Sequence, residues 1–527
     1  MMSFAKKHLV LLSDLLKDRV DAAQCLGVKV SGLTIDSRAI KAGDCFVALK
    51  GTVTDGAHYI QQAVSDGAVA VIIDDATEVA IDSSKITVPI VRVTSLSEGV
   101  SSIAGRFYNN PSDNLSLVAF TGTNGKTTCS RLYAQLVAKV SLYSGVKQSA
   151  YMGTTGYGIA LSQATDAMHS AFESKQVNGA GLTTPDAVSV QRIMAELLNN
   201  GAQSVALEAS SHSLVQHRLK ALQIETAVFT NLSRDHLDYH YDLASYAAAK
   251  ASLFDMPLIK TAVINLDDPV GSQIIKSLRS DIRRFTFSLN NQAADIYCSD
   301  IRLSSSGISA MISTPWGSGE LCSALLGEFN LSNLLAIIGV ACSKGASLKA
   351  CLNALPCLEA VPGRMEALST EMQPQVVVDY AHTPDALEKA LQALKPNCEG
   401  KLWVIFGCGG NRDTGKRSEM GRVAERFADT LVVTSDNPRN ESPKQIAEHI
   451  LQGITGDVQV ELDRKQAIAF SIHQADPQDI VLIAGKGHEN YQIIGDNKEP
   501  FSDQKEALKA LKNTLSNRQS VNNRGEL

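Results

Sequence analysis

The chain has 527 residues, with 49 Lys plus Arg against 55 Asp plus Glu and a formal net charge of −6. At about 100 to 200 residues per domain, this length predicts about three domains, with four as the upper end. The slightly acidic balance excludes the overall basic field of nucleic-acid and membrane-surface binders. It does not exclude anionic ligands that are bound locally. Hydrophobic residues at 44% and charged residues at 20% are typical of a globular protein.

The 10 cysteines form no CxxC pair, which predicts buried free thiols in a reducing compartment. Near the N-terminus, Lys6 and Lys7 precede only a short Leu-rich stretch. No apolar run approaches the roughly 18 residues that a membrane span needs. We therefore expect a cytoplasmic protein with no signal peptide, lipid anchor or membrane insertion.

Short β-branched runs alternate along the chain with Ala- and Leu-rich segments of helical period. The predicted strands are residues 68–73, 115–120, 204–207, 226–229, 261–264, 376–378, 402–406, 430–433 and 479–483. Nearly unbroken apolar strands suit parallel sheets that helices cover on both faces, so the predicted fold class is α/β. Proline-containing stretches at 109–114 and 355–362 divide the chain into three parts, and the polar tail from about Asn513 is expected to fray.

Polar clusters come directly after many of the predicted strands. They are residues 122–128, 208–212, 231–240, 379–385, 407–412, 436–439 and 485–489. In open parallel sheets, ligands bind beyond the carboxyl ends of the strands. These clusters are therefore the predicted binding segments.

Residues 121–128 read TGTNGKTT, follow a predicted strand and open a predicted helix. Such glycines let backbone N–H groups turn toward a phosphate, while Lys126 can reach the β- and γ-phosphates and Thr127 can hold Mg²⁺. Phe120 stands where the full phosphate-loop pattern has its first glycine. The alternative is a glycine-containing turn with a surface lysine, but the strand context and the tandem threonines favour a nucleotide site. The predicted ATP-binding residues here are Gly122, Thr123, Asn124, Gly125, Lys126, Thr127 and Thr128.

Mg²⁺ at such a site needs further oxygen ligands. Glu208 ends one predicted strand, and His236 lies in the polar segment after another. Either residue alone is more often a solvated or hydrogen-bonded structural group. Two such loops after neighbouring strands favour metal or phosphate binding.

Together, the segments 122–128, 208–212, 231–240, 379–385, 407–412 and 436–439 resemble the Mur ligases of bacterial peptidoglycan synthesis. The resemblance covers nearly the whole chain except the tail and parts of 139–181, a segment that looks longer than is typical. It implies three domains. Residues 1–97 would bind the UDP end of the substrate, 98–359 would form a central P-loop ATPase with a parallel sheet and covering helices, and 360–527 would form a Rossmann-like domain for an amino acid.

The resemblance also implies a reaction, in which ATP phosphorylates a D-glutamyl carboxylate and an amine attacks the resulting acyl phosphate. A carboxylate is a poor electrophile until phosphate becomes its leaving group, and Mg²⁺ and cations stabilise the charge during transfer. The implied partners are small molecules, namely ATP, a UDP-N-acetylmuramoyl dipeptide and an amino acid. We expect a monomer that binds no nucleic acid.

Lys250, within YAAAKASLF at 246–254, matches the family lysine that is carbamylated. An ammonium cannot ligate Mg²⁺, whereas a carbamate derived from CO₂ presents carboxylate-like oxygens. Without the resemblance, Lys250 would be predicted to be a solvated helix lysine. The implied catalytic residues are Lys126, Glu208, His236 and Lys250, and the implied metal ligands are Thr127, Glu208, His236 and carbamylated Lys250.

For the UDP-substrate, the resemblance points to Ile35, Ser37, Thr52, Thr183, Thr184, Ser210, Gln216 and Arg218. Hydroxyls and an arginine suit a ligand rich in phosphates, sugar hydroxyls and carboxylates. For ATP it adds Asn330, Arg364, Asp379 and His382. Asp385 lies in the segment 379–385 that carries part of the resemblance, but its presence also has a structural explanation. It follows a Thr N-cap and a Pro at the first helical position, where an acidic residue is favourable.

The implied amino acid is diaminopimelate, which differs from lysine by a second carboxylate. The planar guanidinium of Arg439 can bind that carboxylate through two parallel hydrogen bonds, and it would be left unpaired against lysine. The implied diaminopimelate-binding residues are Arg412, Asp436, Asn437, Pro438, Arg439, Gly485 and Glu489.

Three other functions stay open at this point. One is a sibling enzyme, such as a folylpolyglutamate synthase or a lysine-adding ligase, against which residues 436–439 argue. Another is a nucleotide-binding protein without catalysis, which the intact set of implied catalytic residues disfavours. A plain P-loop kinase would leave the amino-acid motif unexplained.

Overall fold

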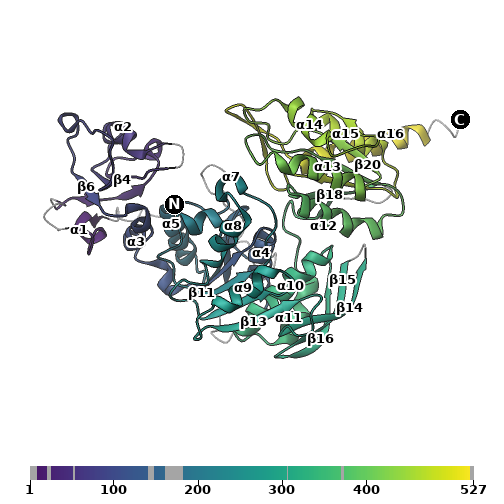
Figure 1. Cartoon of the computed structure of the whole chain (residues 1–527), viewed down its shortest axis with the longest axis horizontal. Helices are drawn as coiled ribbons and strands as arrows, with labels where there is room; N and C mark the ends of the chain where they lie inside the picture. The colour runs from purple at the N-terminus through teal and green to yellow at the C-terminus, as the bar shows by residue number, and fades with distance from the viewer. Residues whose placement is uncertain are drawn as a thin grey trace. The chain divides into compact units, whose positions relative to one another are not determined.

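The structure is a computed structural model that describes residues 9–20, 25, 27–51, 54–140, 148–160, 182–304, 307–368 and 373–522, with side chains given as far as residue 514. Figure 1 shows the chain from its N-terminal segment to α16. Contacts divide the chain into two compact units. They are Met1–Ala119 with Gln148–Ala227 and Ala249–Lys260, and Phe120–Lys147 with Val228–Ala248 and Thr261–Leu527. The domain boundaries at 97/98 and 359/360 stay a prediction.

The first sheet is parallel, in the order β3 (Gly32–Thr34), β4 (Asp44–Ala48), β5 (Ala70–Asp74) and β6 (Ile90–Val93). Alternate residues of β4 point to opposite faces, as the pleat of a strand requires. Cys45 and Val47 join a core with α3 (Leu96–Phe107), and Phe46 and Ala48 join one with α2 (Ile60–Ser65). A short pair, β1 (Val10–Leu11) with β2 (Lys29–Val30), and α1 (Leu12–Leu15) complete this part.

The central sheet has ten strands in the order β16-β15-β14-β13-β12-β11-β7-β10-β8-β9. The strands are β7 (Ser116–Thr121), β8 (Ser149–Gly153), β9 (Gly156–Ile159), β10 (Ser204–Glu208), β11 (Ile224–Phe229), β12 (Thr261–Asn265), β13 (Arg283–Ser288), β14 (Ile296–Ser304), β15 (Gly307–Thr314) and β16 (Gly317–Ser323). The helices of this segment are α4 (Lys126–Lys139), α5 (Ala187–Asn199), α6 (Ser211–Val215), α7 (Leu237–His240), α8 (Leu243–Ala251), α9 (Pro269–Ser277), α10 (Glu328–Ser343) and α11 (Leu348–Ala354).

The α/β class is confirmed, but the edges of the central sheet differ from the predicted parallel arrangement. β12, β13 and β14 pair in parallel, as do β10 and β8. In contrast, β8–β9 and β14–β15–β16 are antiparallel. Direct hairpins explain this difference, because Gly156 and Gly317 adopt positive φ angles of 93° and 122° at the tight turns.

The third sheet has the order β17-β18-β22-β19-β20-β21 and is parallel except for β17, which runs antiparallel to β18. The strands are β17 (Glu366–Leu368), β18 (Gln375–Asp379), β19 (Leu402–Phe406), β20 (Thr430–Val433), β21 (Gln459–Val460) and β22 (Ile480–Ala484). The helices are α12 (Pro384–Leu394), α13 (Gly415–Phe427), α14 (Pro443–Leu451), α15 (Arg464–Gln474) and α16 (Asp503–Asn522), and a hairpin joins β23 (Tyr491–Ile494) to β24 (Asn497–Pro500).

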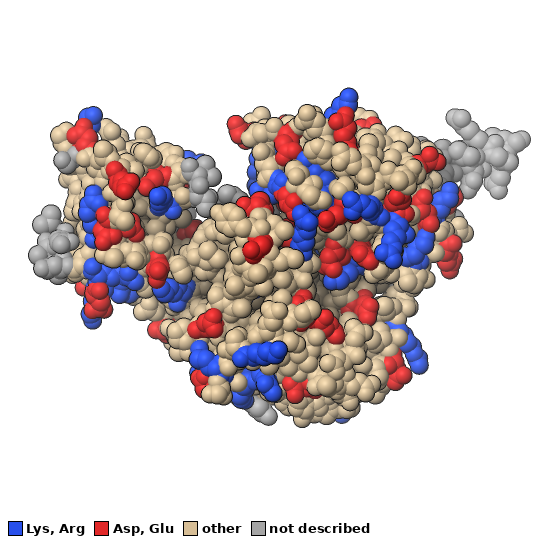
Figure 2. Space-filling view, viewed as in Figure 1, with Lys and Arg blue, Asp and Glu red and all other residues tan. Residues whose placement is uncertain are grey.

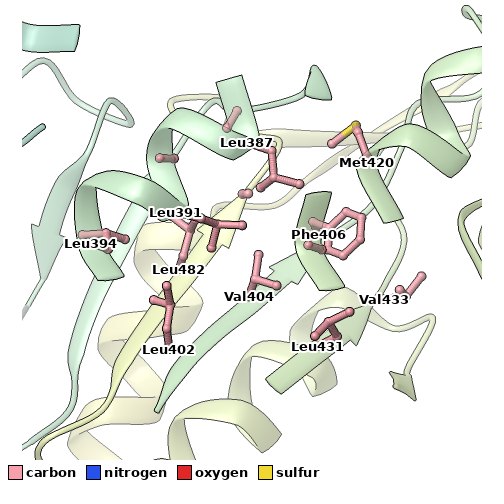
Figure 3. Packing of buried hydrophobic residues seen from close by; sticks show 14 of the residues in the cluster. Leu387, Leu391, Leu394, Leu402, Val404, Phe406, Met420, Leu431, Val433 and Leu482 are labelled. Atoms are coloured by element: carbon pink, nitrogen blue, oxygen red, sulfur yellow. The ribbon is translucent and has the colours of Figure 1, made fainter. Parts of the chain in front are cut away.

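Helices cover both faces of this third sheet. On one face, Val404 and Phe406 of β19 pack with Leu391 of α12 and Met420 of α13 (Figure 3). On the opposite face, the alternate β19 residues pack against α15 and α16. A sheet buried on both faces leaves only its strand ends available for polar loops.

Two features of the chain differ from the sequence-based expectations. α16 continues past Asn513 to residue 522, where the sequence predicts fraying, and Leu511 and Thr514 at this point are buried. The prediction of buried thiols is wrong for Cys322 and Cys357, which are exposed; Cys322 lies on the edge strand β16.

The surface charge pattern fits the near balance of acidic and basic residues. On the face drawn in Figure 2, Lys and Arg are interspersed with Asp and Glu. Within the described part of the chain, no helix combines the length and the apolar character of a membrane span.

Candidate active site

The predicted polar loops all follow strands. Residues 122–128 follow β7, 208–212 follow β10 and 231–240 follow β11 in the central sheet. In the third sheet, residues 379–385, 407–412, 436–439 and 485–489 come at or just after the ends of β18, β19, β20 and β22.

The loop after β7 is held by the segment after β11. Gly122 has φ 150° and Gly125 has φ 87°, both in the region that favours glycine. The Thr230 hydroxyl donates to the Asn124 carbonyl at 2.6 Å, and the Asn231 side-chain oxygen accepts the Asn124 N–H at 2.9 Å. A Cβ at position 122 would lie 1.9 Å from the Thr230 hydroxyl, so only glycine allows this close packing.

Lys126 begins α4 and folds its ammonium back over the loop. Its Nζ donates to the carbonyls of Gly122 and Thr123, each at 2.8 Å. The positive charge therefore lies over the centre of the loop and at a helix N-terminus, where the phosphates of a nucleotide are favoured. Thr127, beside it, is buried, and its hydroxyl accepts from Nη2 of Arg364 at 3.3 Å.

A cavity of about 330 Å³ adjoins this loop. Among its lining residues are the predicted ATP-binding residues Asn124, Gly125, Thr128, Asn330, Arg364 and Asp379. Asn330 is buried and donates to the Leu326 carbonyl at 2.8 Å, and its side-chain oxygen accepts from Asn333. The volume is in the range of small-molecule sites. The structure thus brings most of the predicted nucleotide residues to one place.

Arg364 is held at this cavity by an aromatic ring. Its guanidinium lies 4.4 Å from the centroid of the Tyr380 ring, a cation–π contact. Its Nε is buried and has no hydrogen-bond partner among the described residues. Burial raises the pKa of Asp379, although the Arg364 charge opposes that shift. A buried, unsatisfied guanidinium N–H is a donor for an anionic ligand.

Asp235 links two histidines in the segment after β11. Its Oδ2 lies 3.5 Å from Nε2 of His236 and 3.7 Å from Nε2 of His382. Burial opposes ionisation of Asp235, but the hydrogen bond from His382 and the charges of both histidines and Lys416 hold its pKa well below the usual value. Sequence reasoning assigned no role to Asp235; its signal was its position next to His236.

Glu208 is almost completely buried at the end of β10. Its Oε1 accepts the Thr154 N–H at 2.7 Å, and its Oε2 accepts the Thr154 hydroxyl at 2.9 Å. A Cβ at position 153 would lie 2.0 Å from Oε1, so Gly153 makes room for the carboxylate. The contact of Thr154 with Glu208 was not predicted from the sequence, because the two residues lie at the ends of different strands and are far apart in the chain.

Lys250 lies on α8 and is only 1% exposed, which differs from the solvated lysine that its local sequence alone would suggest. Burial of an ammonium is costly, so this position suits a lysine that is paired or converted to a carbamate. The oxygens of Thr127 and Glu208 also fit the ligand preference of Mg²⁺. Among the residues that the structure describes, no three His, Cys, Asp or Glu side chains gather as a metal site. The metal set stays a prediction.

Four of the predicted UDP-substrate residues are joined by hydrogen bonds. Arg218 donates to the Thr184 carbonyl at 2.6 Å and to the Gln216 side chain at 2.5 Å. The Thr184 hydroxyl accepts the Ser210 N–H at 3.2 Å. Thr183 lies beside Thr184, and Ile35 and Ser37 follow β3 of the first sheet. Thr52 lies outside the described residues.

The predicted amino-acid loops meet at the ends of β20 and β22. Nη1 of Arg439 donates to the carbonyls of Gly410 and Asn437, at 2.9 and 3.4 Å. Its Nε and Nη2 have no hydrogen-bond partner among the described residues. Burial and the nearby charge of Arg412 lower the pKa of Arg439 from its ordinary value, which still leaves the guanidinium protonated at neutral pH.

The other residues of this set lie around Arg439. Nδ2 of Asn437 donates to Glu489 at 2.9 Å. Gly485 has φ 119°, and a Cβ there would lie 2.6 Å from the Asp436 carboxylate. Pro438 is buried directly before Arg439, whereas Arg412 is exposed and donates to the Asn411 carbonyl.

Family models match most of the chain. A model described as the Mur ligase family catalytic domain matches residues 29–108, the Mur ligase middle domain matches 120–341, and the Mur ligase glutamate ligase domain matches 363–487.

Individual relatives are similar along nearly their whole length. UDP-N-acetylmuramoyl-L-alanyl-D-glutamate–2,6-diaminopimelate ligase of Coxiella burnetii is 42% identical over 506 residues, which is 95% of this chain and 99% of the relative. A solved structure of a ligase with that same name is 36% identical, with a TM-score of 0.63 and coverage of 96% and 99%. MurF ligase from Thermotoga maritima in complex with ADP, at 19% identity, a TM-score of 0.59 and coverage of 92% and 98%, shares the fold.

Gly122→Ala is expected to raise the Kd for Mg²⁺-ADP at least tenfold, because the added Cβ would collide with the Thr230 hydroxyl and the loop must shift. Isothermal titration calorimetry measures this Kd. Gly456→Ala is the control, since its Cβ meets Glu425 Oε1 at 3.3 Å outside the cavity. An unchanged Kd in Gly122→Ala would contradict the assignment of this loop to the nucleotide.

Proposed function

Because this chain belongs to the Mur ligase family, we propose that it is the ATP-dependent ligase that adds meso-2,6-diaminopimelate to the D-glutamyl carboxylate of UDP-N-acetylmuramoyl-L-alanyl-D-glutamate. The observation that carries the choice of amino acid is the open guanidinium of Arg439 beside Glu489. The near-complete coverage of relatives that have this name supports the same choice.

The reaction runs in two steps. A carboxylate oxygen of the D-glutamyl residue attacks the γ-phosphorus of ATP, ADP leaves, and an acyl phosphate forms. The free amine of diaminopimelate then attacks the acyl carbon, and the tetrahedral intermediate expels phosphate to leave the amide. The amino group loses its proton on the way, so the products are the amide, ADP, phosphate and H⁺.

Lys126 and Arg364 stabilise the charge in the first step. The ammonium of Lys126 lies over the phosphate loop, and Arg364 is among the residues that line the adjoining cavity. Cations fixed where negative charge develops lower the barrier to phosphoryl transfer, because they need no reorganisation at that moment. We assign the cavity beside the loop to the nucleoside of ATP.

The amino-acid end is complementary to a zwitterion. Nε and Nη2 of Arg439 are available to a carboxylate, and Oε1 of Glu489 accepts no hydrogen bond from a described residue, so it is available to an ammonium. Diaminopimelate has an ammonium and a carboxylate at the end far from the new bond. Lysine has no carboxylate there, so the guanidinium of Arg439 would stay desolvated and unpaired.

We assign Mg²⁺ to Thr127, Glu208, His236 and a carbamate on Lys250. The ion would neutralise charge on the phosphates of ATP while they react. The buried carboxylate of Glu208 and the buried position of Lys250 support this assignment.

The remaining parts of the proposal follow from the substrates. Residues 1–97, with Thr183, Thr184, Ser210, Gln216 and Arg218, bind the UDP-sugar peptide, 98–359 bind ATP, and 360–527 bind diaminopimelate. Each of the three substrates then has its own surface. We place the enzyme in the cytoplasm, where ATP is supplied, and propose that it acts as a monomer.

Purified protein with ATP, Mg²⁺ and the UDP-muramoyl dipeptide is expected to release phosphate with meso-diaminopimelate at least 100-fold faster than with L-lysine. In Arg439→Ala this preference should fall at least tenfold, because the partner of the distal carboxylate is gone. Arg422→Ala, at an exposed position of α13, is the control. Equal turnover of the two amino acids by the unmodified protein would contradict the proposed substrate.

Lys250→Ala is expected to lower kcat at least 100-fold, and added bicarbonate should not restore it, because the side chain that would take up CO₂ is absent. The same phosphate-release assay measures this effect. Lys260→Ala is the control, since Lys260 is exposed and pairs with Glu225 at 3.0 Å. Full activity of Lys250→Ala would refute the carbamate assignment.

A further inference from the structure

Lys486 is a fully buried lysine two residues after the end of β22. Its Nζ donates to Oδ1 of Asn437 at 3.1 Å and to Oε2 of Glu489 at 3.0 Å. The Tyr491 ring centroid lies 5.5 Å from the same nitrogen. Lys486 lies within the predicted binding segment 485–489, but its own side chain has no assigned role.

We propose that Lys486 is a positioning residue for the amino-acid substrate, which holds Glu489 and Asn437 in the geometry that receives the ammonium of diaminopimelate. This inference rests on the proposed function. It adds a residue that acts through Glu489 and does not touch the substrate itself.

The hydrogen-bond partners of Lys486 indicate a role in the amino-acid site and not only in a structural ion pair. Both hydrogen-bond acceptors of its ammonium are predicted diaminopimelate residues, and they come from two different loops. Asn437 also connects these loops to the β23–β24 hairpin, because its Oδ1 accepts the Ile493 N–H at 2.9 Å. Lys486 is therefore the cation at the centre of a network that spans the strand ends of β20 and β22.

The hydrogen bonds around Lys486 leave one carboxylate oxygen of Glu489 available to the substrate. Oε2 of Glu489 accepts from both Lys486 and Asn437, whereas Oε1 accepts from no described residue. Two donors on one oxygen fix the rotamer of Glu489. A substrate ammonium then meets an oriented oxygen and does not have to order it.

The effect of removing the ammonium follows from its burial. Without Lys486, the Glu489 carboxylate would lose its charge partner in a mostly buried place, with a side-chain exposure of 15%. The carboxylate would then turn toward solvent, and this change of orientation weakens binding of an ammonium. The nucleotide loop and the UDP-sugar residues would be unaffected.

Steady-state kinetics of Lys486→Met in the full-length enzyme tests this role. We expect the KM for meso-diaminopimelate to rise at least tenfold, while the KM values for ATP and for the UDP-muramoyl dipeptide stay within twofold. Lys498→Met is the matched control, because Lys498 lies 3.6 Å from the centroid of the same Tyr491 ring. It should leave all three KM values unchanged. Equal changes in the three KM values of Lys486→Met, or none, would overturn the proposal.

A double-mutant cycle with Glu489→Gln asks whether Lys486 acts through Glu489. If it does, the double variant should raise the KM for diaminopimelate by little more than Glu489→Gln alone. Multiplicative effects of the two changes would overturn the proposal. Should Lys486→Met fail to fold, Lys486→Gln, which keeps a hydrogen-bond donor, takes its place with the same expected selectivity.

Failure of this inference and failure of the proposed function give different results. If the unmodified enzyme does not require diaminopimelate, the proposed function is wrong. If it does require diaminopimelate and the Lys486 variants show no selective change in that KM, only the positioning role is wrong.

Discussion

The hydrogen bond from the Thr230 hydroxyl to the Asn124 carbonyl, at 2.6 Å, fixes the nucleotide loop to the segment that follows β11. Its oxygen lies where a side chain on Gly122 would have to be. That segment continues to Asp235, which contacts both His236 and His382. The phosphate loop, the candidate metal ligand His236 and the loop after β18 therefore depend on one another.

Positively charged side chains are buried behind the loops of the third sheet. Arg417 contacts Glu441 and the Gly409 carbonyl, and Arg464 pairs with Asp503 and donates to the Ala484 carbonyl. Lys486 is the third such cation. Each is almost fully buried, and breaking a buried ion pair costs about 3 to 5 kcal/mol. Such pairs oppose rearrangement of the loops, so the proposed amino-acid site is preorganised.

The sequence predicted the loops well because their signals are local. A β-branched run that is followed by glycines, or by a polar segment such as residues 436–439, indicates the end of a strand. This signal does not depend on which strands pair with each other. The antiparallel edges of the central sheet were missed, because β14 and β16 mix polar with apolar residues and lack the apolar runs from which the strands were predicted. Thr154 was also missed, since its contact with Glu208 joins residues far apart in the chain. Lys486 lies in the predicted segment 485–489 but was given no role, since its contact with the distant Asn437 is not visible in the sequence.

Lys250 shows the limit of local patterns. Its neighbours in the helix are mostly alanines, which predict an ordinary surface lysine, yet the side chain is 1% exposed. Burial depends on which helix face meets the rest of the fold, and a short helix rich in alanine has no clear apolar stripe to indicate that face. Only the resemblance to a family pointed to this residue.

Oxygen transfer from the acceptor carboxylate to phosphate tests the central claim most directly. The UDP-muramoyl dipeptide is prepared with ¹⁸O in both oxygens of the D-glutamyl carboxylate that accepts the amino acid. It is incubated with ATP, Mg²⁺ and meso-diaminopimelate, and the phosphate is examined by mass spectrometry. Passage through an acyl phosphate predicts one ¹⁸O in each released phosphate and one in the new amide. Phosphate without ¹⁸O would contradict the account.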